Sequence, residues 1–148
     1  MYEALKIVHS SWAYLVVLIV ALATINALVK YITKKEYGPK DFRISLFALI
    51  VTHLQLLIGI VIFFISPKVV WFTDGIATAE IMKDPLLRLY NVEHPTVMIA
   101  MVAFITIGYS KHKKKLTSTP KFKMLAIFYT IAFILMLSRI PWSQWINF

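Results

Sequence analysis

Three of the four histidines, His9, His53 and His94, lie inside or at the edge of segments apolar enough to cross a membrane. An ionisable side chain in hydrocarbon costs about 3 kcal/mol even on insertion-based scales, so such residues usually serve a function. A neutral imidazole can bind a metal ion or pass a proton. The positions of these histidines are therefore the main clue to the chemistry of this chain.

The depth of each polar residue follows from its distance along a helix from the nearest charged or aromatic residue at the outer rim. At ~1.5 Å per residue, His9 lies about 5 Å deep, His94 about 9 Å, Arg139 about 5 Å and His53 about 22 Å. We therefore expect His9, His94 and Arg139 to share an outer layer. His53 is expected near the middle of the membrane or in its cytoplasmic half.

Four long apolar stretches must position these residues. Hydrophobic residues make up 59% of the 148-residue chain, far above the globular norm. Each stretch supplies the ~20 residues that a helix needs to cross a bilayer. The sequence predicts an all-α membrane protein, a single domain over residues 1–148 with helices at about 5–31, 40–65, 85–110 and 122–142. Short connections favour an antiparallel up-down four-helix bundle, with the first and third helices on one diagonal.

Positive charge is concentrated in two connections. Eleven of the sixteen Lys and Arg residues fall there: Lys30, Lys34, Lys35, Lys40 and Arg43 in the first, and Lys111, Lys113, Lys114, Lys115, Lys121 and Lys123 in the third. By the positive-inside rule these connections are cytoplasmic, and both termini face the outer, periplasmic side of a bacterial inner membrane. Contact with anionic membrane lipids explains the net charge of +9 without a nucleic-acid partner.

Local signals mark several helix ends and exclude some chemistry. Pro39 suits the first position of the second helix, and Asp84 followed by Pro85 suits the start of the third. Pro95 then falls inside the third helix, where it frees the carbonyl of Asn91 and favours a kink beside His94. A start of the third helix at Pro95 itself would leave a short span.

Two further inferences follow from the sequence. We expect the first apolar segment to be a retained helix rather than a removed signal peptide. The absence of cysteine excludes a thiol oxidoreductase.

His9 and His94 form the first candidate pair, because a b-type haem needs two imidazoles from helices that face each other across the porphyrin. Arg139 is placed to meet the haem propionates, or alternatively to extend to the lipid headgroups. Glu93 should point away from the iron-binding face, toward the outer loop. On this hypothesis His9 and His94 are the axial iron ligands.

Other polar residues leave alternatives open. His53 is either bonded to a backbone carbonyl or to Gln55, or it replaces one axial ligand, or it holds a second cofactor. The set Thr52, Gln55 and Gly59 shares a helix face that suits either interhelical bonding or a quinone carbonyl. Met98 and Met101 fit packing better than ligation. His112, among lysines, is expected to be solvated.

Several stretches resemble a family of short bacterial inner-membrane proteins described as cytochrome b-like. The likeness spans nearly the whole chain and is carried by residues 53–60, 92–95, 107–111 and 138–142, with His9-Ser10 at the entrance. A weaker resemblance, on the Gln55 to Gly59 region, is to one four-helix half of haem A synthase. The resemblance implies haem contact by His9, His53 or His94, without saying which two.

These observations lead to the expectation of a membrane electron-transfer protein that binds haem b and exchanges electrons with a quinone or a redox partner protein. Two alternatives stay open. One is a non-catalytic accessory subunit of a larger membrane complex, in which the histidines are structural. The other is a proton or ion pathway that uses His94, Glu93 and His53 at different depths.

Overall fold

The computed structural model describes residues 1–146, and the residues it describes form helices and connections without a strand. Four segments are long and apolar enough to cross a membrane, which is the make-up of a multi-pass membrane protein. They are α1 (Tyr2–Ile32), α2 (Pro39–Ile65), the run Pro85–Lys113, and α6 (Ser118–Arg139). The third run comprises α4 (Pro85–Arg88), the π-helical turn η1 (Leu89–Glu93) and α5 (His94–Lys113).

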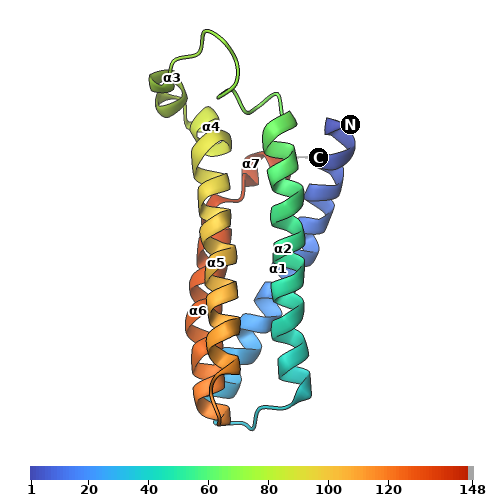
Figure 1. Ribbon diagram of the computed structural model, residues 1–148, viewed down its shortest axis with the longest axis vertical. Helices are drawn as coiled ribbons and strands as arrows, with labels where there is room; N and C mark the ends of the chain where they lie inside the picture. The colour runs from blue at the N-terminus through green and yellow to red at the C-terminus, as the bar shows by residue number, and fades with distance from the viewer. Residues whose placement is uncertain (147–148) are drawn as a thin grey trace.

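Two ends of the bundle differ in character (Figure 1). Connections 33–38 and 114–117 meet at one end, which we call the lysine end. The N-terminus, the connection 66–77 with the short helix α3 (Thr78–Lys83), and the short helix α7 (Trp142–Trp145) lie at the other, which we call the histidine end. Because α1 packs mainly on α2 and α6, and α5 packs on α6 and α2, helices α1 and α5 stand on a diagonal. The predicted diagonal is therefore present.

Helix starts follow the local signals. Pro39 occupies the first turn of α2, and the Asp41 carboxylate accepts a hydrogen bond from the backbone N–H of Gly38 at 2.9 Å. Asp84 caps α4 by accepting from the N–H groups of Leu86 and Leu87. Both starts are as predicted, because a missing proline N–H costs nothing where no acceptor precedes it.

The fourth long helix differs from its prediction of 122–142. It begins at Ser118 and ends at Arg139, and Trp142 belongs to the separate helix α7. The early start shows that Lys121 and Lys123 lie on the helix rather than in the loop. The early end arises because Ile140 precedes Pro141 and takes an extended conformation, with ψ 133°.

Closely packed side chains fill the lysine half of the bundle. Residues buried in α1 begin at Val16, those in α2 end at Thr52, and those in α5 begin at Met101. Gly108 lets α5 approach α6 closely, since a Cβ there would stand 2.5 Å from the Cβ of Phe128. His9, in the third turn of α1, and His94, at the start of α5, lie beyond this core.

His112 is a correction to the sequence prediction: it is fully buried, not solvated. Its Nδ1 bonds the carbonyl oxygen of Tyr109, which can only accept, so Nδ1 carries the proton and Nε2 accepts from the hydroxyl of Tyr37 at 2.8 Å. Burial raises the pKa of Tyr37 to about 12, which keeps that donor protonated. The contact ties connection 33–38 to the end of α5.

We predict that Tyr37→Phe lowers the melting temperature of the detergent-solubilised protein, because Nε2 of the buried His112 loses the one donor it has among residues 1–146. An unsatisfied buried acceptor costs about 1–3 kcal/mol, which corresponds to roughly 2–4 °C per kcal/mol in a chain of this size. Tyr31→Phe is the matched control, since no hydrogen bond of its hydroxyl is found within residues 1–146. Equal shifts in both variants would contradict the role of the Tyr37–His112 contact.

Candidate functional site

Two imidazoles lie next to each other at the histidine end. His9 lies in the third turn of α1 and His94 is the first residue of α5, and their ring centroids are 6.3 Å apart with 76° between the ring planes. They come from the diagonal helices α1 and α5. Gln55 of α2 bonds the backbone carbonyl of His9, and the carbonyl of Arg139 in α6 bonds the ring of His94, so both residues are bonded from other helices. The structure therefore brings together the pair that the sequence predicted from depth.

One ring nitrogen of His94 is engaged by the backbone. Its Nδ1 lies 2.8 Å from the carbonyl oxygen of Arg139, at the end of α6. A carbonyl oxygen only accepts, so Nδ1 carries the proton and Nε2 keeps its lone pair. A histidine that binds a metal usually has this arrangement, with the second nitrogen donating to a carbonyl or carboxylate.

His9 is held from the side of α2. Gln55 donates from Nε2 to the carbonyl oxygen of His9 at 2.9 Å, and Gly59 lies so close to the imidazole that a Cβ there would be 3.3 Å from its Cε1. The His9 Nδ1 is buried without a hydrogen-bond partner among the described residues, and so is the Oε1 of Gln55. Two unpaired polar atoms thus belong to the contact between α1 and α2 at the histidine end.

Thr52, Gln55 and Gly59 have different roles in the structure. Gln55 makes an interhelical bond, which was one of the two interpretations of this set, and Gly59 leaves space for the imidazole of His9. Thr52 instead bonds the carbonyls of Ala48 and Leu49 in its own helix. The interhelical prediction is therefore wrong for Thr52.

Charged groups line the rim of this site. Glu93 accepts from Arg88 at 2.8 Å, and its other carboxylate oxygen lies 3.4 Å from the Nε of Arg139. Glu93 thus joins Arg88 of α4 to Arg139 at the end of α6, and its pairing with Arg139 was not foreseen. The Arg139 side chain remains 44% exposed, so it can still meet an anionic group at the rim.

The turn before His94 shows how a proline inside a helix is accommodated. Pro95 has no N–H for the carbonyl of Asn91, and the indole Nε1 of Trp71 donates to that carbonyl at 2.9 Å. The helix widens into η1 just before this point, and such turns often occur at functional positions. The freed carbonyl was predicted; its partner from the outer connection could not be.

Asn91 also fastens the outer connection to the helix. This buried amide accepts from the N–H of Val70 at 2.8 Å and donates to the carbonyls of Lys68 and Leu87 at 3.0 and 2.8 Å. Sequence reasoning did not single out the Asn91 side chain. The only signal for it was an amide in an apolar stretch, one turn before the proline.

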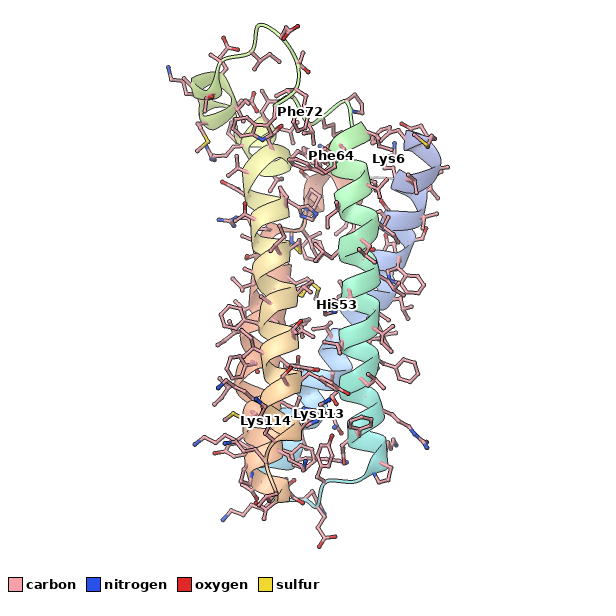
Figure 2. All side chains as sticks on the ribbon, in the orientation of Figure 1. Lys6, His53, Phe64, Phe72, Lys113 and Lys114 are labelled. Atoms are coloured by element: carbon pink, nitrogen blue, oxygen red, sulfur yellow. The ribbon has the colours of Figure 1, made fainter. Side chains whose placement is uncertain are left out.

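His53 lies apart from the pair, midway along the bundle and between α2 and α5 (Figure 2). Its side chain is exposed rather than buried, its Nδ1 bonds the carbonyl of Leu49, and its Nε2 is 3.4 Å from the hydroxyl oxygen of Thr106. The backbone partner was one of the predicted alternatives. Within residues 1–146 no hydrogen bond joins His53 to His94 or Glu93.

Methionines near the site serve packing. Met101 belongs to the buried core, and Met98 packs against that core. Both follow His94 on the same helix, so they form the apolar floor beneath the histidine layer. This agrees with the prediction that they pack.

In comparisons with known proteins, no protein-family model, curated protein or solved structure matches this chain. The candidate site therefore has to be interpreted from its own geometry.

We predict that Asn91→Ala loosens the outer connection above the site. The amide of Val70 loses its acceptor and the carbonyls of Lys68 and Leu87 lose their donor, so hydrogen exchange at Val70 should accelerate by at least about tenfold, the equivalent of one lost hydrogen bond of roughly 1.4 kcal/mol. Exchange is measured by mass spectrometry on peptides covering residues 66–77. Thr73→Ala, in the same connection, is the control; equal protection in all three proteins would contradict the clamp.

Proposed function

We propose that the chain binds one b-type haem between His9 and His94 and transfers electrons within the membrane. The observation that carries this proposal is the spacing of the two rings. Metal–imidazole bonds are about 2.0 Å long, so two imidazoles on opposite sides of one metal ion have centroids roughly 6 Å apart. The separation of 6.3 Å between His9 and His94 fits that requirement.

The number of protein ligands supports haem over a bare ion. Within residues 1–146 no cluster of three or more His, Asp or Glu side chains could hold a metal ion by itself. Two imidazoles are sufficient only where a macrocycle supplies the remaining ligands, as in a b-type cytochrome. The unpaired Nδ1 of His9 and the free Nε2 of His94 are the donor atoms on the chain's side.

The packing around the pair suits a flat, apolar group. The buried core of α1, α2 and α5 lies below the histidine layer, and α2 packs on α5 less extensively than the other adjacent long helices pack on each other. Gly59 lets the His9 imidazole pack closely against α2. A b-type haem bound there supplies one-electron redox chemistry.

The chain's own residues set the conditions for that chemistry. The carbonyl of Arg139 orients His94 through Nδ1 and makes Nε2 a better ligand. Apolar helix faces exclude water, and the guanidinium of Arg139 at the rim offers a cation for propionate carboxylates.

Orientation follows from charge. We propose an antiparallel up-down bundle with the lysine end in the cytoplasm and both termini on the outer side of a bacterial inner membrane, in accord with the positive-inside rule. The resemblance of the stretches around His53, His94 and Arg139 to cytochrome b-like proteins implies haem contact and is part of the same proposal. Electron exchange with a quinone or with a partner protein belongs to the same proposal.

We predict that the protein purified after expression with ample haem shows the reduced-minus-oxidised spectrum of a low-spin bis-imidazole haem. His94→Ala and His9→Ala should each abolish haem retention, because a b-type haem has no covalent tether. His53→Ala is the matched control and should retain the spectrum. A colourless wild-type protein would contradict the proposal. Loss of haem in His53→Ala with retention in His9→Ala would show that His53, and not His9, is the axial ligand.

We predict that Arg139→Gln keeps the haem but lowers its reduction potential, because a cation near the propionates favours the reduced state. The expected shift is on the order of 30–60 mV, given that 59 mV corresponds to a tenfold change for one electron. Redox titration measures it, with Arg43→Gln at the lysine end as the control. An unchanged potential would mean that Arg139 serves only Glu93 and the lipid headgroups.

A further inference from the structure

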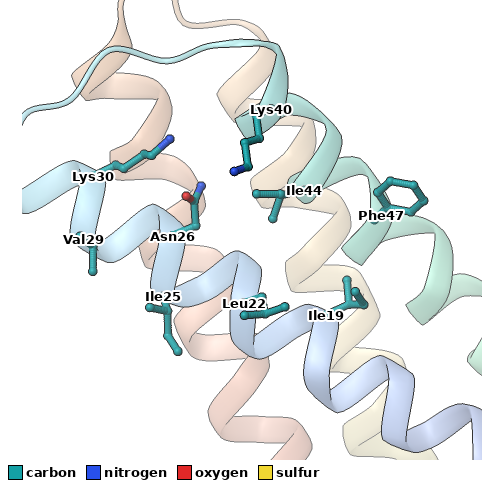
Figure 3. A pocket seen from close by; sticks show the side chains of 9 residues that line it. All are labelled: Ile19, Leu22, Ile25, Asn26, Val29, Lys30, Lys40, Ile44 and Phe47. Carbon is teal, nitrogen blue, oxygen red and sulfur yellow. The ribbon is translucent and has the colours of Figure 1, made fainter.

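A groove between α1 and α2 lies at the lysine end, away from the histidine pair. It has a volume of about 420 Å³. Figure 3 shows its apolar wall, made by Ile19, Leu22 and Ile25 of α1 and by Ile44 and Phe47 of α2. These side chains belong to two membrane-spanning helices, and Leu22, Ile25 and Phe47 are each more than half exposed. The groove therefore opens sideways toward hydrocarbon.

One end of the groove is cationic. Lys30 and Lys40 stand there with Asn26, and in Figure 3 the Lys40 side chain extends from α2 toward α1 above Asn26. Lys30 is already neutralised by Asp41, whose buried carboxylate it meets at 2.6 Å and which also accepts from Asn26 at 2.9 Å. For the ammonium of Lys40, no ion pair or hydrogen bond is found within residues 1–146.

Helix stability does not explain the position of Lys40. It lies in the first turn of α2, where the partial positive charge of the helix N-terminus disfavours a cation. A cation that opposes the helix dipole and has no partner in the protein is positioned to meet an anion from outside.

We propose that this groove binds one acidic phospholipid of the leaflet next to the lysine end, with an acyl chain along the apolar wall and the phosphate at Lys40. The length of the groove fits a single leaflet: Ile19 to Lys30 spans about 16 Å at 1.5 Å per residue, and half of a ~30 Å hydrocarbon core is about 15 Å. The proposal is independent of the haem, because it uses none of the residues at the histidine end.

Charge complementarity sets the expected preference. A lysine near the membrane surface contributes about 1 kcal/mol toward binding an anionic lipid, which corresponds to a roughly fivefold change in affinity. A zwitterionic lipid with the same acyl chains should therefore bind about fivefold more weakly than phosphatidylglycerol.

Native mass spectrometry of the full chain in mild detergent tests the proposal. The protein is titrated with dioleoyl-phosphatidylglycerol and with dioleoyl-phosphatidylcholine, and the lipid-bound fraction is measured. Lys40→Gln should lose the preference for phosphatidylglycerol, and Lys40→Arg should restore it. Lys123→Gln, an exposed lysine on α6 at the same end, is the control and should bind like the wild type.

Two further measurements distinguish the contribution of the acyl chains from that of the phosphate. Leu22→Trp fills the apolar wall and should weaken binding of both lipids, while glycerol phosphate without acyl chains should not compete at equal concentration. Equal binding of the two lipids by the wild type, equal losses in Lys40→Gln and Lys123→Gln, or full competition by glycerol phosphate would each overturn the proposal.

Discussion

Hydrocarbon offers no hydrogen-bond partner, and this constraint governs the whole bundle. A polar group on a membrane-spanning helix must be satisfied inside the protein or lose several kcal/mol, on the order of 2–7 for an unpaired amide or hydroxyl. The lysine half meets the constraint: Asp41 is paired with Lys30 and Asn26, and the hydroxyl of Tyr129 donates to the carbonyl of Ser45. These contacts join the helices specifically. Apolar faces alone give little driving force for helix association in a membrane, because lipid tails are as apolar as leucine.

Within residues 1–146, buried polar atoms without a hydrogen-bond partner are found mainly at the histidine end. Among the described residues, the buried side-chain nitrogen and oxygen atoms without a partner are the Nδ1 of His9, the Oε1 of Gln55 and the Oγ1 of Thr130. Two of the three lie in one layer beside Gly59. The bundle is thus tightly paired at one end and incompletely paired at the other, a division that suits a rigid base carrying a site for a bound group.

Sequence reasoning went furthest where the physics is local. Hydropathy located the four long helices, Pro39 and Asp84–Pro85 marked two starts, and Pro95 implied the freed carbonyl of Asn91. It failed where a partner lies far along the chain. His112 was expected in water because its neighbours are lysines, yet Tyr37 covers it from another connection. Lysine density likewise hid the start of α6 at Ser118.

By itself, the sequence determined the membrane-spanning make-up of the chain, the nearness in level of His9 and His94, and the concentration of lysines in two of the connections. Each depends on composition and on the fixed rise of a helix, which act within a few residues. Only the tertiary structure decided that the His9 ring lies beside the His94 ring, that the Arg139 carbonyl orients one of them, and that Lys40 stands at the end of a groove beside α1. Those outcomes depend on how each helix is rotated against its neighbours, which is set by the packing of residues distant in sequence, such as Gly59 on His9 and Gly108 on Phe128.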